Sequence, residues 1–471
     1  MALAELERVA RNEAGIALAL DILKQRFGER FQTGRDVRSQ HAHSMTYIPS
    51  QAPDGVLFAR GASEVQETVR ICAEHRVPVI PFGVGSSLEG HVNAPGGGVS
   101  IDMSGMNRVL AVNVEDLDCT VEPGVTREQL NQHLRATGLF FPIDPGANAS
   151  LGGMAATRAS GTNAVRYGTM RENVIALDAV MADGRLITTA RRAKKSSAGY
   201  DLTRLLVGSE GTLGVITSLT LRLHGIPQAI SGGVCPFPSV EEACLAVIAT
   251  IQMGVPVARI ELINAPGMEA LNAYAGLGYP ESPCLFVEFH GSDNSVREQA
   301  EIFGEIVADY DGGPFIWTSV AEERMKLWKA RHDAYLACRA LRPGYAALAT
   351  DVCVPISRLA ECITETEEDV VRMGLTAPIV GHVGDGNFHV QVMTDPSSPE
   401  EIAAMEAFVA RLNLRAIAMD GTCTGEHGVG QGKTAFLRHE VGDGVDFMRM
   451  IKQALDPLNI MNPGKTLPPA A

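Results

Sequence analysis

Two histidines, His382 and His389, are the residues of this sequence best placed to bind a metal ion. They flank Asp385-Gly386, a dipeptide typical of a two-residue hairpin turn. That turn would pair 384 with 387, 383 with 388 and 382 with 389, so the two imidazoles are expected directly opposite each other, with Cβ atoms about 4.5–5.5 Å apart. Imidazoles so placed can share one ion at about 2.0–2.2 Å from each nitrogen. The alternative is a pair of polar histidines on a solvated hairpin face.

Arg331, within Trp328 to Tyr335, is the candidate cation for an acidic ligand. A guanidinium is planar and can bind a carboxylate through two parallel hydrogen bonds. The alternative is an exposed helix arginine. A nucleotide-triphosphate loop is suggested by Gly432-Lys433-Thr434, but the glycine required five residues before Gly432 is His427, so that interpretation is excluded.

A loop from Pro81 to Gly90 has the composition of a phosphate-binding loop. Its glycines at 83, 85 and 90 allow a backbone to approach a ligand closely, and Ser86 and Ser87 offer hydroxyl and N–H donors. It is not the dinucleotide fingerprint, because Leu88 fills the last glycine position and residues 89–98 are too rich in Gly, Pro and Asn to open a helix. A pyrophosphate is therefore expected on loop N–H groups. The alternative is a strand connection that binds nothing.

Two further stretches are unusually small or glycine-rich. Nearly every side chain from Asp144 to Gly168 is small, and such residues cannot fill a core by themselves. They leave room for something flat and large, of which a cofactor ring is the simplest case. The stretch from Gly208 to Ile216 adds three glycines beside Glu210 and then continues as a strand.

Together, these three stretches resemble the flavoproteins of the vanillyl-alcohol-oxidase type, whose first domain binds FAD. Within that superfamily, the chain is most similar to the D-lactate dehydrogenases that pass electrons to cytochrome or quinone. Glycolate oxidase flavin subunits and D-2-hydroxyglutarate dehydrogenases are near relatives, and the resemblance covers roughly residues 45 to 467.

The resemblance implies an α+β fold in four parts. A helical segment (1–45) precedes an FAD-binding domain of the vanillyl-alcohol-oxidase (PCMH) type (46–224). An α+β substrate domain with an antiparallel sheet follows (225–420), and a C-terminal segment (421–471) returns to the flavin and completes the active site. FAD contacts are expected from the three stretches, from His91 and from the tail: Pro81, Gly83, Gly85, Ser86, Ser87, Leu88, Gly90, His91, Pro145, Gly146, Ser150, Gly152, Gly153, Ala156, Ser160, Gly161, Asn163, Tyr167, Gly168, Glu210, Gly211, Gly214, Val215, Ile216 and Asn462.

The resemblance also assigns roles at the reacting centre. His382, His389 and Glu426 match the ligands of a divalent ion, which ligand type alone does not identify among zinc, manganese, iron and cobalt. His427 matches the proposed base, and Arg331 matches the arginine that holds the substrate carboxylate. D-2-hydroxyglutarate enzymes carry a lysine for the second carboxylate where this chain has Ala349, which favours a monocarboxylate. FAD is expected to be non-covalent, with a covalent link at His91 as the alternative.

The implied reaction is oxidation of a D-2-hydroxy acid to the 2-oxo acid, and D-lactate is the leading candidate for the substrate. Electrons are expected to pass to cytochrome, quinone or an electron-transfer protein. One alternative is the flavin subunit of glycolate oxidase, which needs a separate iron–sulfur partner; another is a D-2-hydroxyglutarate dehydrogenase. A flavin-binding protein without turnover is a third, and the clustered His, Glu and Arg argue against it.

Local patterns predict the elements that position these residues. From Val56 the pattern is strand, helix, strand, with Ser63 and Gln66 expected to form a capping box at the helix start. A second capping box is expected at Thr126 and Gln129, and a hairpin at 182–185. After Pro227, longer amphipathic helices (240–253, 296–309 and 400–419) alternate with strands such as 284–289.

Composition limits the class of protein. A chain of 471 residues with 45% hydrophobic residues predicts two or three globular domains. Its net charge of −15 argues against nucleic acid or an anionic membrane as the main partner. The nine cysteines include no Cys-x-x-Cys pair, which predicts reduced thiols and no iron–sulfur cluster. No secretory signal or apolar run of 18 residues is evident, so a cytoplasmic location is expected; peripheral contact at the inner face of the membrane and a homodimer are left open.

Overall fold

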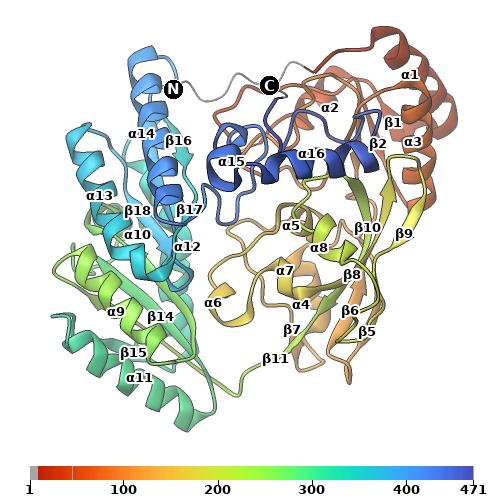
Figure 1. Ribbon diagram of the computed structural model, residues 1–471. Coiled ribbons are helices and arrows are strands. Elements are labelled where there is room, and N and C mark those ends of the chain that lie inside the picture. Colours follow the sequence, from red (N-terminus) through yellow and green to blue (C-terminus); the bar gives the residue numbers. More distant parts are fainter. Residues whose placement is uncertain (1–8, 45, 470–471) are drawn as a thin grey trace. The chain divides into compact units, whose positions relative to one another are not determined.

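In a computed structural model of the chain, residues 9–44 and 46–469 are described, and they divide into two compact units (Figure 1). The first unit holds residues 9–160, 168–226 and 426–469, and the second holds 161–167 and 227–425. Within the described residues, the chain therefore passes from one unit to the other at four points: 160/161, 167/168, 226/227 and 425/426.

A four-stranded sheet forms the first half of the first unit. Its order is β1-β2-β4-β3, with β2 and β3 both parallel to β4. The strands are β1 (Phe31–Gln32), β2 (Gly55–Phe58), β3 (Val79–Phe82) and β4 (Val99–Asp102), and the helices beside them are α1 (Glu13–Phe27), η1 (Gly28–Arg30), α2 (Arg35–Gln40) and α3 (Ala62–His75). The capping box predicted at Ser63 is wrong: α3 begins after Gly61 without a side-chain cap, and the Gln66 amide donates to the Gly184 carbonyl at 3.0 Å.

A five-stranded antiparallel sheet of order β5-β6-β10-β8-β9 forms the second half of the first unit. Its strands are β5 (Val109–Asn113), β6 (Asp118–Val121), β8 (Val174–Met181), β9 (Leu186–Thr188) and β10 (Gly214–Arg222). The predicted hairpin at 182–185 is confirmed, since it joins β8 to β9. The predicted box at Thr126 is also confirmed and opens α4 (Arg127–Leu134), whose Leu130 and Leu134 are fully buried.

Shorter elements complete the first unit. They are β7 (Leu139–Phe140) paired with β11 (His224–Gly225), α5 (Leu151–Thr157), α7 (Met170–Asn173), α8 (Leu202–Leu206), α15 (Thr434–Val441) and α16 (Gly444–Leu455). The C-terminal segment meets the first sheet at one point, where Met461 forms a parallel bridge to Val79, the first residue of β3.

An eight-stranded sheet forms the centre of the second unit. Its order is β15-β12-β14-β13-β18-β19-β16, with β17 also paired to β19, and every pair is antiparallel, as predicted. The strands are β12 (Ala229–Pro236), β13 (Val257–Ile263), β14 (Cys284–Gly291), β15 (Ile316–Thr318), β16 (Ala346–Ala349), β17 (Val352–Cys353), β18 (Ile379–His382) and β19 (Asn387–Thr394).

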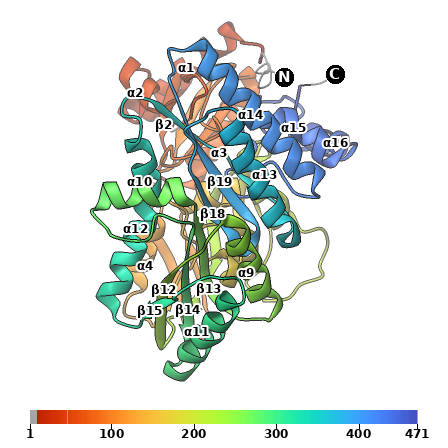
Figure 2. The ribbon, with the colours of Figure 1, turned by 90° about the vertical axis from the view of Figure 1, so that its left-hand side faces the viewer.

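Helices cover both faces of this sheet. Figure 2 shows α10 (Ala265–Ala275) and α12 (Ala321–Ala340) on one side of the central strands, and α9 (Val240–Gln252) and α13 (Leu359–Arg372) on the other. The remaining helices are α6 (Ala164–Tyr167), α11 (Asp293–Ala308), η2 (Ile356–Arg358), η3 (Val383–Asp385) and α14 (Pro399–Ala418). Leu327, Trp328, Arg331, Ala334 and Cys338 recur at helical spacing on the buried side of α12, so Arg331 lies on a core-facing stripe.

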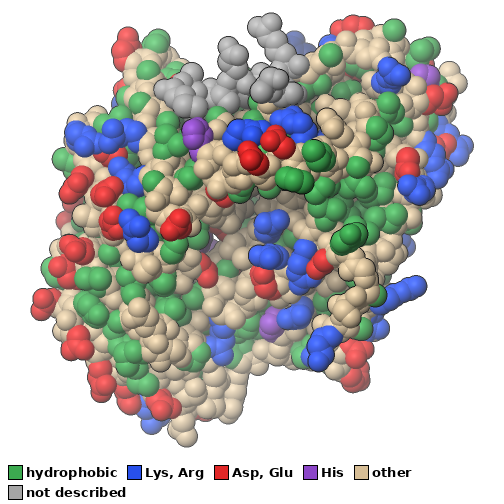
Figure 3. All heavy atoms as spheres, in the orientation of Figure 1, with side chains coloured by type: hydrophobic (Ala, Val, Ile, Leu, Met, Phe, Trp, Pro, Cys, Tyr) green, Lys and Arg blue, Asp and Glu red, His purple; other side chains and the backbone are tan. Residues whose placement is uncertain are grey.

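Two surface properties bear on partners. Acidic and basic side chains are interspersed over the face drawn in Figure 3. None of the described helices combines the length and hydropathy that a membrane-crossing segment requires.

Candidate active site

The hairpin that carries the two histidines has a different register from the predicted one. Val380 pairs with His389, and His382 pairs with Asn387. The turn is longer than the Asp385-Gly386 dipeptide, because Val383–Asp385 forms the 3-10 turn η3 and Gly386 follows it with φ 79°. The predicted pairing of 382 with 389 is therefore wrong, by two residues.

The shift leaves both imidazoles on the same face of the sheet. Side chains alternate faces with a period of two, so only an odd shift would have separated them. Their ring centroids are 5.3 Å apart, with the ring planes nearly perpendicular. The side chains of His382 and His389 are 13% and 7% exposed, which contradicts the alternative of a solvated pair.

Each histidine is held through its Nδ1 atom by an acceptor of the second unit. Nδ1 of His382 lies 2.9 and 2.8 Å from the two carboxylate oxygens of Glu261 on β13. Nδ1 of His389 lies 2.8 Å from the carbonyl oxygen of Thr350. These groups only accept hydrogen bonds, so each Nδ1 carries the hydrogen and each neutral ring keeps its lone pair on Nε2. Two such nitrogens on one face fit the donor set of a divalent transition metal.

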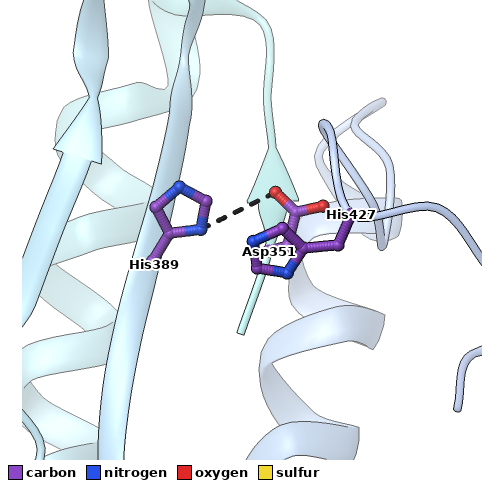
Figure 4. A group of neighbouring side chains, drawn as sticks. All are labelled: Asp351, His389 and His427. Carbon is purple, nitrogen blue, oxygen red and sulfur yellow. Dashed lines mark ion pairs between the residues drawn. The ribbon is translucent and has the colours of Figure 1, made fainter. Parts of the chain in front are cut away.

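Asp351 is a second carboxylate behind the histidine pair and is fully buried. Figure 4 draws it beside His389, whose Nδ1 is 3.7 Å from Asp351 Oδ1. Its oxygens accept hydrogen bonds from the Asn387 amide and the Thr424 hydroxyl, both at 2.9 Å. Asp351 thereby fixes Asn387 and Thr424, the latter two positions before Glu426, and places a carboxylate beside His389.

Arg331 is 8% exposed, which contradicts the alternative of an exposed helix arginine. Its Nη2 donates to Glu261 at 2.6 Å. Its Nε is buried and has no hydrogen-bond partner among the described residues. A buried cationic N–H group without a partner is costly, which fits a guanidinium that receives an anionic ligand.

Glu426 and His427 belong to the first unit and follow the last passage of the chain between the units. His427 lies in the first unit with its Nδ1 3.9 Å from Oε1 of Glu89. Gly428 follows with φ 82°, and a Cβ there would lie 2.7 Å from a carboxylate oxygen of Glu210. The segment therefore needs glycine at 428 to present His427. The roles of Glu426 as ligand and His427 as base stay predictions.

The three glycine-rich stretches predicted to hold FAD meet in the first unit. A Cβ added at Gly83 would collide with the Ser150 hydroxyl, which joins the 81–90 loop to the 144–168 stretch. A Cβ added at Gly211 would lie 2.9 Å from Cγ of Pro81, which joins the 208–216 stretch to the same loop. Residues without side chains at these positions let the three backbones come together.

The loop offers polar groups for a phosphate. The Ser87 hydroxyl is buried and has no hydrogen-bond partner among the described residues. Gly85 and Gly90 have φ 70° and 74°, which side-chain-bearing residues rarely adopt. An unpartnered hydroxyl in a glycine-shaped loop fits a ligand oxygen, so the residues present fit the pyrophosphate of a dinucleotide cofactor.

Glu210 anchors the first unit internally. Its carboxylate accepts the backbone N–H groups of Val429 at 2.6 Å and Gly430 at 2.8 Å, and Nε2 of His91 lies 3.2 Å away. Burial raises the pKa of Glu210, but the charge and hydrogen bond of His91 and the two backbone donors outweigh it, so the pKa is lowered. Both carboxylate oxygens are thus bonded within the protein.

The predicted return of the C-terminal tail to these loops is present in the first unit. The Asn462 amide donates to the Glu210 carbonyl at 2.7 Å and to the His91 carbonyl at 3.2 Å. Three other predicted FAD contacts, Gly161, Asn163 and Tyr167, belong to the second unit. There Asn163 accepts from Arg259 at 2.9 Å and the Tyr167 hydroxyl lies 2.8 Å from His290.

Reasoning from the sequence missed the carboxylates that orient the site. Glu261 is the one acid in the mostly apolar strand Val257–Ile263 and is 1% exposed, so an acid in a buried strand was the available signal. Asp351 gave a similar signal, since it begins the short apolar strand that ends at Pro355.

Comparisons with known proteins place two domain families on this chain. Residues 53–190 match the FAD binding domain family, and residues 226–466 match the C-terminal domain of FAD linked oxidases. Two solved structures show the same fold at low identity. One is p-cresol methylhydroxylase with substrate bound (16% identical, TM-score 0.82, 97% of each chain covered). The other is 4-ethylphenol oxidase from Gulosibacter chungangensis (16% identical, TM-score 0.79, 97% of this chain and 98% of that one covered).

Curated relatives are similar over nearly the whole chain. A protein of Danio rerio named probable D-lactate dehydrogenase, mitochondrial, is 52% identical and covers 93% of this chain and 89% of its own. The Arabidopsis thaliana D-lactate dehydrogenase [cytochrome], mitochondrial, is 47% identical, covering 95% of this chain and 78% of its own. Glycolate oxidase subunit GlcD of Bacillus subtilis is 32% identical, covering 93% and 94%.

Proposed function

The chain belongs to the FAD-linked oxidase family together with the cytochrome-type D-lactate dehydrogenases, and we propose that it oxidises D-lactate to pyruvate with electron transfer to FAD. The observation that carries the proposal is the likeness to D-lactate dehydrogenases over more than nine-tenths of the chain. The site supports the proposal, because the second unit contains both a buried arginine that can bind a carboxylate, Arg331, and two histidines whose Nε2 atoms can bind a metal ion, His382 and His389.

FAD is held by the first unit in this proposal. The 81–90 loop binds the pyrophosphate through its N–H groups and Ser87, and the small residues of 144–160 and 208–216 leave space for the rings. Bound flavin supplies an acceptor for the two electrons and the hydrogen removed from C2 of lactate. The FAD is non-covalent, which is supported by the burial of His91 and by its ring nitrogen facing Glu210. Acid precipitation should leave the yellow colour in the supernatant.

The second unit holds the substrate. Arg331 binds the lactate carboxylate with the guanidinium N–H groups that Glu261 does not use. Ala349, on β16, offers no cation for a second carboxylate, which supports a monocarboxylic substrate. With the carboxylate fixed, the C2 hydroxyl is directed towards the groups that remove its proton.

His382, His389 and Glu426 are the residues that would hold a divalent ion, which would supply a Lewis acid for the substrate hydroxyl. His427 takes the hydroxyl proton onto a ring nitrogen as C2 loses its hydrogen with the bonding electron pair. One proton and one hydride equivalent leave lactate, which gives pyruvate. Removing the ion with a chelator should stop lactate-driven flavin reduction and leave FAD bound, since the loops that hold FAD contribute no ligand.

The acceptor of the electrons is a cytochrome in this proposal, as the names of two relatives specify for those proteins. We expect a cytoplasmic location from the sequence, whereas several relatives are named mitochondrial. Cell fractionation decides between the two compartments.

Anaerobic titration of the purified protein tests the proposal. D-lactate, L-lactate, glycolate and D-2-hydroxyglutarate are each added while the visible flavin spectrum is recorded. D-lactate should bleach the flavin fastest. Faster bleaching by L-lactate or by D-2-hydroxyglutarate would overturn the assignment of substrate.

The flavin subunit of a glycolate oxidase is a second candidate, favoured by the similarity to the Bacillus subtilis subunit. Such a role needs an iron–sulfur partner, because the nine cysteines of this chain are scattered and lack the spacing of cluster ligands. Preference for glycolate together with a co-purifying iron–sulfur protein would select this candidate.

A further inference from the structure

We infer that Glu261 is a positioning residue, one buried carboxylate that orients both the metal-binding histidine His382 and the substrate-binding arginine Arg331. The inference rests on the proposed function, and it goes beyond that function by naming the group that connects the metal-binding residues to the substrate-binding arginine. All three residues lie in the second unit, on three different elements: β13, β18 and α12.

The cost of burying Glu261 is the first reason for the inference. Its side chain is 1% exposed, in a strand whose other side chains are mostly apolar and buried. An ionised carboxylate in such a place is unfavourable unless its partners compensate it. Within the described part of the chain, the side chains that bond its two oxygens are Arg331 and His382.

The interaction with His382 selects the ring nitrogen that faces the ligand. Because a carboxylate only accepts hydrogen bonds, Nδ1 carries the hydrogen and Nε2 keeps its lone pair. The negative charge of Glu261 beside Nδ1 also raises the basicity of Nε2, so that its lone pair binds a cation more strongly. His389 receives the same orientation from the backbone carbonyl of Thr350, which no side-chain substitution removes, so a change at Glu261 alters the hydrogen bond of His382 and leaves that of His389 in place.

The interaction with Arg331 fixes the guanidinium plane. Oε2 of Glu261 accepts from Nη2 at 2.6 Å, while the buried Nε is left for a ligand. Without this hydrogen bond, the guanidinium would be free to rotate and more of its N–H hydrogens would have no partner. A substrate carboxylate would then meet a less ordered cation.

Glutamine at 261 is the sharpest perturbation, because it keeps the shape and removes one acceptor and the charge. Its single carbonyl oxygen can serve His382 or Arg331, but its NH₂ group repels the N–H group of the other. Glu261→Gln should weaken binding of Mn²⁺ or Zn²⁺ to the substrate-free protein by about 10- to 100-fold, measured by competition with a chelating dye. It should also raise the Kd for D-lactate about tenfold, measured from anaerobic flavin reduction.

Matched variants separate positioning from loss of stability. Asp369→Asn removes another buried carboxylate of the second unit, 1% exposed and bound by Arg411 and Arg415, that touches neither His382 nor Arg331. It should lower the melting temperature and leave the metal affinity and the lactate Kd as in the unmodified protein. Glu261→Asp keeps the charge but has a shorter reach, so it should fold and show both defects more weakly.

Three results would overturn the inference. One is unchanged metal affinity and lactate Kd in Glu261→Gln and Glu261→Asp. Another is a change in only one of the two quantities, which would remove the link between the halves. The last is additive effects on the lactate Kd when Glu261→Gln is combined with Arg331→Lys, since a residue acting through Arg331 must give non-additive effects. The metal titration needs no substrate, so failure of the unmodified protein to oxidise D-lactate would refute the proposed function and leave this test standing.

Discussion

Replacing Arg331 by lysine should separate substrate binding from the other steps. Lysine keeps the positive charge near Glu261 but has a compact ammonium in place of the planar guanidinium. In the structure, Nη2 of Arg331 is bonded to Glu261 and the buried Nε has no partner among the described residues. A lysine donates from one nitrogen only, so while it keeps its ion pair with Glu261 it cannot offer the lactate carboxylate the paired N–H groups of a guanidinium.

The size of the effect follows from the hydrogen bond that lysine cannot make to the lactate carboxylate. One hydrogen bond between charged groups contributes about 1.5–3 kcal/mol. At about 1.4 kcal/mol for each factor of ten, Arg331→Lys should raise the Kd for D-lactate by about 10- to 140-fold. A buried charge that loses its partner entirely costs about 3–5 kcal/mol of stability. The free energy of unfolding should fall by less than this in Arg331→Lys, because the lysine ammonium still faces Glu261.

Anaerobic stopped-flow measurement of flavin reduction provides the assay. The dependence of the rate on D-lactate concentration gives the Kd, and its plateau gives the rate of the chemical step. Arg339→Lys is the control, since Arg339 is exposed on the same helix and contacts the Tyr335 ring instead of the site. A Kd within twofold of the unmodified protein would refute the role of Arg331 in carboxylate binding. A lower plateau at constant Kd would do so too, because it indicates an interaction made only in the transition state.

Three further predictions concern the metal, the thiols and the acid response. His389→Ala should lower the content of divalent metal, measured by mass spectrometry, and leave the flavin-to-protein ratio unchanged; loss of FAD would instead show that the histidine is structural. Burial raises the pKa of most thiols, of Cys72 for example to about 12, whereas Cys353 is partly exposed, so a thiol reagent should label one residue rapidly in the native protein. Rapid labelling that persists in Cys353→Ser would contradict this. The pKa of Glu210 is lowered in the folded state, so its contribution to stability is complete above the ordinary carboxyl pKa and is lost as the pH falls through the lowered one. Urea unfolding followed from pH 7 to well below the ordinary carboxyl pKa of 4.5 should therefore show a flatter acid decline for Glu210→Gln, and parallel profiles below that pH would exclude Glu210 as an acid-sensitive group.

Sequence patterns were sufficient where a structure is decided by near neighbours. The capping box at Thr126 was predictable because both hydrogen bonds span three residues. The same pattern at Ser63 failed, because the helix begins two residues earlier, with Gly61 as its N-cap, and the Gln66 amide finds a partner 118 residues away. The histidine hairpin lies between these cases. Its turn was predicted too short, but the prediction that His382 and His389 share one face of the sheet is confirmed, because the pairing register differs by an even number of residues.

The carboxylates that orient the candidate site, Glu261 and Asp351, could not be predicted from local sequence patterns, because their partners are distant in the sequence. Glu261 contacts residues 70 and 121 positions further along the chain, and Asp351 contacts one 73 positions away. No local pattern encodes such distances. The sequence shows only that each of these acids lies in an apolar stretch. A buried acid must have a partner, but the sequence does not identify that residue.

The four passages of the chain between the units affect how the protein can diversify. Residues 161–167 are separated in sequence from the rest of the second unit, yet Asn163, Arg166 and Tyr167 are bonded to Arg259, the Pro256 carbonyl and His290. A single recombination event near residue 226 would therefore join this short segment from one parent to hydrogen-bond partners from another. Exchange of residues 227–425 alone between two relatives therefore keeps these hydrogen bonds only where the donor and acceptor side chains are the same in both parents.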